Sequence, residues 1–73
     1  MNNDDETTIK EKVNTFFELK ISVHISLKNK DWRNGDIISI SEKYFLLNEN
    51  HLGEIPIFFT DIYDIDKLTE VKE

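Results

Sequence analysis

Two histidines are the side chains of this sequence best suited to bind a metal ion. His51 lies in a polar segment just before Glu54, whereas His24 lies far upstream, so these three possible zinc ligands have no short, regular spacing. The chain has no cysteine that could complete a zinc site. We therefore expect no metal site and no other cofactor.

Acidic and nucleophilic residues form no pattern typical of catalysis. Asp61, Asp64 and Asp66 crowd together, but they lack the spacing and the glycine of a calcium loop. The sequence contains only two glycines, no glycine-rich phosphate loop and no serine in a nucleophile turn. A chain of 73 residues also leaves little room for a substrate pocket beside its core. We expect no catalytic residues, and we expect the three aspartates at the surface.

Four residues could together contact nucleic acid. Lys30, Arg33 and Lys43 could neutralise phosphates, and the Tyr44 ring could stack on a base. Two other interpretations remain open, because a tyrosine often covers a core with its hydroxyl outward and spaced lysines often only face solvent. The net charge of -6 argues against nucleic-acid binding over the whole surface, so any such site must be local.

Length and composition indicate one small globular domain. Of the 73 residues, 38% are hydrophobic, and without cysteine the chain forms no disulfide. A domain of this size buries only about 60–65% of its unfolded surface, so area gained from a partner would add stability. The N-terminal segment is acidic, unlike a signal peptide, and no apolar segment could span a membrane. We expect a cytoplasmic protein with a flexible acidic tail at 1–6, one domain at 7–68 and a charged tail at 69–73.

The spacing of apolar residues predicts one helix and five strands. Ile9, Val13, Phe16 and Phe17 form one stripe of a helix at 7–19. Alternating or dense β-branched and aromatic residues then predict short strands within 20–68. Their ranges are 20–28, 32–41, 44–49, 55–59 and about 62–67.

Gly35 lies inside the second predicted strand, where a glycine commonly marks a bend or the close approach of another backbone. The alternation changes phase here, since Trp32 is out of phase with Ile37 and Ile40. The strand at 44–49 is apolar on both faces, and the helix is its expected second cover. The predicted fold is mostly β: an N-terminal α-helix, then a five-stranded, strongly bent antiparallel sheet closed into a small barrel.

This order of elements resembles the Sm-like fold, the small SH3-like barrels of Sm, Lsm and Hfq proteins. The resemblance covers about residues 8–67 and rests on VHISLKNKDWRNGDIISISEKYFLLNE, which matches the family's first motif in outline. The segment IPIFFTDIYDI takes the place of the second motif. Uncharacterised archaeal Sm-like proteins look similar. The resemblance implies a non-catalytic binding or assembly protein of a family that often acts with RNA.

The family's uridine-binding residues carry over poorly. Members that bind RNA place an Asp, a stacking residue and an Asn after the bent strand, where this chain has Ser41, Tyr44 and Phe45. Their second motif has an Arg-Gly pair where this chain has Phe58 and Phe59. A phenyl ring donates no hydrogen bond to a phosphate or a uracil. Only Tyr44 fits its role, so the resemblance implies a barrel without the usual uridine pocket.

The segment around Pro56 predicts an edge strand suited to self-association. Proline has no N–H for a ladder, and if Ile57 and Phe59 point into the barrel, alternation turns Phe58 outward. In Sm-like rings the fourth strand pairs with the last strand of a neighbour, which implies a ladder between 55–59 and 62–67 of two copies. The alternative is that Phe58 packs under the helix or C-terminal tail of its own chain. The predicted partner edge consists of Ile55, Ile57, Phe58, Ile62, Tyr63 and Ile65.

Three functions therefore remain open at this point. The first is a homo-oligomeric Sm-like module that acts in RNA-related assembly. The second is an adaptor that binds a protein partner without RNA, which the missing uridine pocket and the net charge of -6 favour. The third is an acidic mimic of nucleic acid, which fifteen carboxylates permit but nine basic residues oppose. We expect no membrane partner for any of them.

Overall fold

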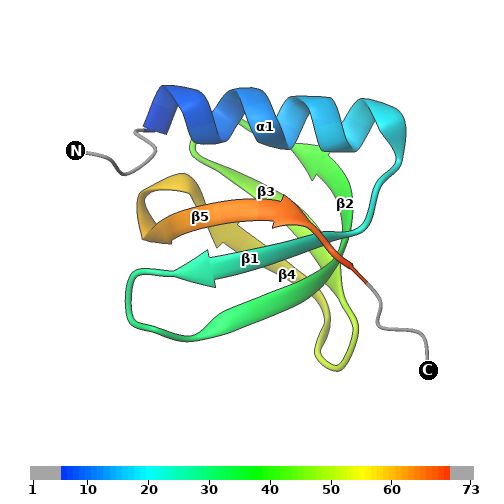
Figure 1. Cartoon of the computed structure of the whole chain (residues 1–73). Coiled ribbons are helices and arrows are strands. Elements are labelled where there is room, and N and C mark those ends of the chain that lie inside the picture. Colours follow the sequence, from blue (N-terminus) through cyan, green and yellow to red (C-terminus); the bar gives the residue numbers. More distant parts are fainter. Residues whose placement is uncertain (1–5, 70–73) are drawn as a thin grey trace.

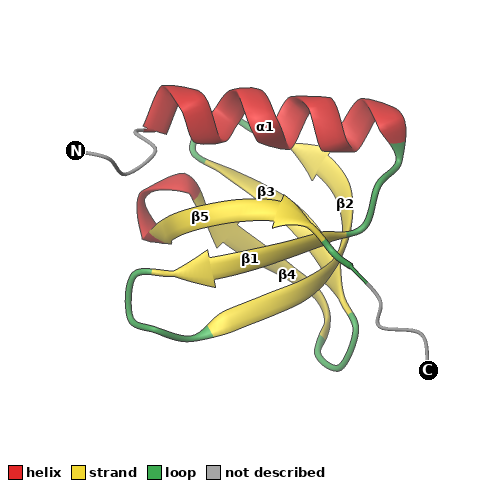
Figure 2. Cartoon of the chain, viewed as in Figure 1, coloured by secondary structure: helices red, strands yellow, loops and turns green. Residues whose placement is uncertain are grey.

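The computed structural model describes residues 6–69 and contains one helix, five strands and one short 3-10 turn (Figures 1 and 2). Of the predicted tails at 1–6 and 69–73, residues 1–5 and 70–73 lie outside the described residues, and Glu6 belongs to the helix. The strands start and end within three residues of their predicted limits. The elements are α1 (Glu6–Leu19), β1 (Val23–Leu27), β2 (Trp32–Ile40), β3 (Tyr44–Glu49), β4 (Gly53–Phe58), η1 (Phe59–Asp61) and β5 (Ile62–Lys67).

The five strands form one antiparallel sheet in the order β4-β3-β2-β1-β5. Strands β4 and β5 are its two ends and do not pair with each other. The closed barrel is therefore not confirmed, although the mostly β fold and the single N-terminal helix are. The helix α1 lies across one end of the curled sheet (Figure 1). Within residues 6–69, the fold thus leaves two sheet edges without a partner strand.

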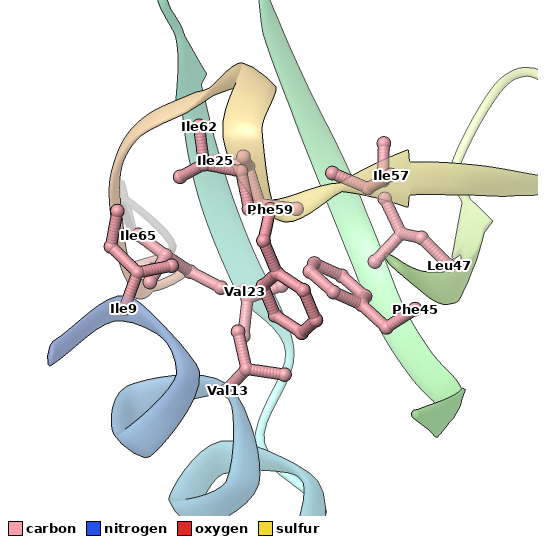
Figure 3. Packing of buried hydrophobic residues seen from close by; sticks show 10 residues of the cluster. All are labelled: Ile9, Val13, Val23, Ile25, Phe45, Leu47, Ile57, Phe59, Ile62 and Ile65. Carbon is pink, nitrogen blue, oxygen red and sulfur yellow. The ribbon is translucent and has the colours of Figure 1, made fainter. Parts of the chain in front are cut away.

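The core lies between α1 and the inner face of the sheet. Strands β1, β3, β4 and β5 contribute buried side chains to it, and Ile37 and Ile40 of β2 pack partly against it. Ile9 and Val13 of the predicted stripe are buried, Phe16 packs partly against the core, and Phe17 is 37% exposed. The main contacts of α1 are with β2, β5 and η1, so the expected cover of β3 by the helix is not what the structure shows. Figure 3 shows the ten buried residues: Ile9, Val13, Val23, Ile25, Phe45, Leu47, Ile57, Phe59, Ile62 and Ile65.

Gly35 is the residue at which β2 passes from one partner strand to the other. It pairs with Val23 of β1 on one side and with Glu49 of β3 on the other. An added Cβ would overlap the carbonyl of Asn48 and lie 2.9 Å from the Glu49 Cα. The prediction that another backbone comes close at this glycine is therefore confirmed.

Two irregularities of the ladder explain why apolar residues fall out of phase. Along β2 the register shifts at Ile38, and this bulge, not Gly35, lets Ile37 and Ile40 both pack against the core although they are three residues apart, whereas Trp32 lies on the outer face. Along β5 the register shifts between its partners Ser26 and Leu27, and Tyr63 is the extra residue. The spacing of three between Ile62 and Ile65 does not come from the 3-10 turn η1, which ends before Ile62. The bulge at Tyr63 instead lets both isoleucines point into the core.

Candidate binding surfaces

The structure does not gather the four predicted nucleic-acid residues into one site. Lys30 lines a groove on the outer face of β1, whereas Arg33 lines a separate hollow beside β4. Arg33 also forms an ion pair with Asp31 at 3.1 Å. Tyr44 and Lys43 lie at the start of β3, beside the end of β4.

Tyr44 and Phe58 form an aromatic pair on β3 and β4. The two residues face each other in the register, and their ring centroids are 5.4 Å apart. Phe58 remains 45% exposed, so the helix does not cover it and it lies outside the core. One side of the Tyr44 ring is thus already in contact with Phe58, which leaves less of it free for a base.

The outer edge of β4 offers few hydrogen-bond donors. The bond of 3.0 Å from the Phe59 N–H to the Lys43 carbonyl fixes the alternation of this ladder, so Glu54, Pro56 and Phe58 turn their backbone groups outward. Pro56 therefore costs no bond to β3, because the N–H that it lacks would face solvent. The same proline removes the middle donor from the free edge, a common protection of edge strands.

The outer edge of β5 has its donors occupied by side chains of its own strand. The bond from the Leu68 N–H to the Ser22 carbonyl turns Ile65 and Lys67 outward in this ladder. The Ile65 N–H donates to Asp64 Oδ1 at 2.9 Å, and the Lys67 N–H donates to Asp66 Oδ1 at 2.8 Å. A partner strand must displace these carboxylates before it can pair with β5.

The six residues of the predicted partner edge do not share one exposed surface. Ile57, Ile62 and Ile65 are buried in the core, and Ile55 packs partly against it. Their side chains therefore stabilise the domain itself, and only their backbones reach an edge. Phe58 and Tyr63 are exposed, on β4 and β5 respectively.

A groove of about 410 Å3 lies on the outer face of β2, β1 and β5. Trp32 of β2 is 51% exposed and Tyr63 of β5 is 53% exposed, and both rings line it. Further lining comes from His24, Ser26, Leu27, Lys28, Lys30 and Asp31. We call this the aromatic groove.

Sequence reasoning missed the aromatic groove because its residues come from three strands. The ladder places Trp32 of β2 beside His24 of β1 on this face, with ring centroids 6.0 Å apart. Tyr63 reaches this face only because it is the bulged residue of β5. The position of a bulge depends on pairing with β1, and no local pattern around Tyr63 signals it.

Glu49 is a buried carboxylate that organises the β3–β4 turn. It is 5% exposed, and its Oε1 accepts the N–H groups of His51 at 2.7 Å and Leu52 at 2.8 Å. Its Oε2 accepts the Asn34 N–H at 3.4 Å. The bonds from His51 and Leu52 hold the pKa of Glu49 below its ordinary value, because they stabilise the ionised form. Glu49 is thus occupied by turn geometry, which explains its burial without a catalytic role.

We expect Glu49→Gln to make the free energy of unfolding less dependent on pH in the acidic range, which we call the acid branch of the stability curve. Because folding lowers the Glu49 pKa, its contribution is present above the ordinary glutamate pKa of about 4.3 and is lost as pH falls through the lowered value. The amide cannot supply two charged acceptors, so the variant should be less stable near pH 7 and less sensitive to acid. Urea unfolding at several pH values measures this, with exposed Glu54→Gln as control. A variant with the wild-type acid branch would contradict the assignment.

The residues considered for metal binding are not brought together. Within residues 6–69, no three histidine, cysteine or acidic side chains form a group that could hold a metal ion. His24 Nδ1 instead lies 2.6 Å from Asn34 Oδ1, and Asp64 forms an ion pair with Lys12 at 3.2 Å. No helix in this described part is long and apolar enough to cross a membrane.

Comparisons with models of protein families and with curated proteins found no match to this chain. The Sm-like resemblance therefore rests on the sequence pattern and on the order of the elements.

Proposed function

We propose that the chain is a non-catalytic Sm-like binding module that assembles with copies of itself through the surface of β4. One observation carries this proposal: β4 is an edge strand of the described sheet that pairs only with β3, and it presents the exposed Phe58 ring beside Tyr44. Leu52, in the turn just before β4, is also exposed, at 61%. Exposed apolar side chains along a sheet edge are typical of a contact with a partner.

The order β4-β3-β2-β1-β5 supports the Sm-like part of the proposal. It leaves the fourth and fifth strands as the free edges, which are the strands that pair between subunits in Sm-like rings. Here such a ladder would begin with few free donors, because Pro56 has no N–H and Asp64 and Asp66 occupy those of β5. The contact therefore draws its free energy mainly from apolar side chains, with Phe58 at its centre.

A role in RNA-related assembly follows from the resemblance, and the scattered positions of Lys30, Arg33 and Lys43 give it no added support. We therefore place self-assembly first and RNA second. Binding of oligo-uridine or oligo-adenine at low salt would support the RNA role, and its absence would favour the protein adaptor.

Phe58→Glu is expected to dissociate the oligomer while the domain stays folded. The charge would need desolvation at the contact, whereas the ring is 45% exposed in the single chain and contributes little to its core. Light scattering over a range of concentrations measures the mass, and circular dichroism checks the fold. Leu19→Glu is the matched control, because Leu19 is 63% exposed and belongs to α1 and not to an edge strand.

A wild-type chain that remains monomeric at high concentration would overturn self-assembly. Loss of folding in Phe58→Glu would show that Phe58 belongs to the core, which contradicts its place on the outer face. Dissociation by Leu19→Glu alone would move the contact to the helix.

A further inference from the structure

The strands that carry Trp32 and Tyr63 are spaced widely enough for one planar ring to lie between the two side chains. Trp32 of β2 and Asp64 of β5 are both register partners of Ser26, and Tyr63 is the residue next to Asp64. Strands on either side of a central strand lie about 9.5 Å apart. A ring inserted between two side chains needs about 7–8 Å, since carbon atoms stack at about 3.5–4.0 Å on each face. Trp32 and Tyr63 can therefore flank a single flat ligand, with Ser26 and Leu27 between them.

The charged side chains that line the aromatic groove lie at one end of it, at the β1–β2 turn. Lys28 and Lys30 line it at the β1–β2 turn. Asp31 also lines it, but its carboxylate accepts the Trp32 N–H at 3.0 Å and pairs with Arg33 at 3.1 Å. These contacts lower the pKa of Asp31 and keep it ionised and engaged. The two lysines remain as the cations available to an anionic ligand at this end.

We propose that the aromatic groove binds a single nucleotide. The base lies between Trp32 and Tyr63, and the phosphate reaches Lys28 and Lys30 at the turn. This goes beyond the assembly function, because it uses the outer face of β1 and not the edge of β4.

Volume and charge favour one nucleotide over a nucleic-acid strand. A groove of about 410 Å3 falls in the size range of small-ligand sites. Beyond it, Asp64 and Asp66 lie on β5 beside Ser26 and His24, and the chain carries a net charge of -6. Further phosphates of a strand would meet these carboxylates, whereas one phosphate at the lysine end would not.

The chain provides its own probe for this binding, because Trp32 is its only tryptophan. Stacking of a base on the indole should quench its fluorescence in a saturable way. We would titrate the wild-type chain with adenosine 5′-monophosphate, adenosine and ribose 5-phosphate. The expected order is that the monophosphate binds about tenfold more tightly than either part alone, with an affinity that falls as salt rises.

Substitutions distinguish the contribution of base stacking on Tyr63 from that of the phosphate contact with Lys28 and Lys30. Tyr63→Ala should weaken the monophosphate about tenfold and leave Trp32 as the reporter. The double change Lys28→Gln and Lys30→Gln should weaken it to the level of adenosine and remove the salt dependence. Phe17→Ala and Lys20→Gln are matched controls, because both residues are exposed at the C-terminal end of α1 outside the groove, and both variants should bind as the wild type does.

Several outcomes would overturn the proposal. Equal binding of adenosine and its monophosphate would exclude a role for the lysines. An oligo-adenylate that binds more tightly with each added nucleotide would indicate a strand, and tighter binding of an acidic proline-rich peptide would indicate a peptide groove. Absence of quenching at millimolar monophosphate would refute the site. Because Phe58→Glu leaves the groove intact, it should retain nucleotide binding whether or not the chain assembles.

Discussion

Replacing Gly35 with alanine should lower the free energy of unfolding by about 3 kcal/mol. The new methyl group would overlap the Asn48 carbonyl and lie 2.9 Å from the Glu49 Cα. Both are backbone atoms of a paired strand, so neither can move aside as a flexible side chain could. The overlap must push β3 away from β2 and disturb the buried Phe45 and Leu47 beside it. Urea unfolding followed by circular dichroism measures the change.

Gly53→Ala provides the comparison, because Gly53 is the only other glycine. A Cβ there would meet no atom within 4 Å, and the cost arises only from the positive φ of 81°. We expect a loss of about 1 kcal/mol, typical of an L-residue in left-handed conformation. If the two substitutions cost the same, the close approach at Gly35 is not the reason for a glycine at that position.

Phe45→Ala should lower the stability by about 4 kcal/mol, the largest effect that we expect from a side-chain truncation. Phe45 is fully buried, and its ring centroid lies 5.6 Å from that of Phe59. Removing the ring leaves a cavity between β3 and η1, because paired strands cannot collapse onto it. Small domains have little stability to lose, so most molecules should be unfolded at 37 °C. Thermal unfolding by calorimetry measures this.

Leu52→Ala is the control for Phe45→Ala, since Leu52 is 61% exposed. Its truncation should change stability by less than about 0.5 kcal/mol. A folded Phe45→Ala with a transition near that of the wild type would mean that the core repacks around the lost ring.

Local periodicity was sufficient to predict the elements of this fold. The stripe of Ile9 and Val13 predicted the helix, and the alternation around Val23 and Ile25 predicted β1. Pro56 predicted an edge strand because proline is excluded from central strands, and β4 is indeed an edge. Each of these inferences depends only on neighbours along the chain.

Features that depend on pairing could not be predicted in the same way. The bulges at Ile38 and Tyr63 arise from the register with β3 and β1, and they decide which side chains face outward. The register also decides which residues of different strands are neighbours, so the sequence alone could not place Tyr44 relative to the basic residues. The open edges, too, follow from how far the sheet curls, which no single segment specifies.

The position of β2 also has a consequence for how the chain folds. Its first half pairs with β1 and its second half with β3, and both pairings meet at Gly35. Two hairpins therefore share one strand, and neither can complete its ladder until that strand is in place. Such sharing removes any independently stable half and favours an all-or-none transition. The complete sheet also requires pairing between β1 and β5, which are far apart in the sequence. Such distant contacts slow folding relative to a helical domain of equal length.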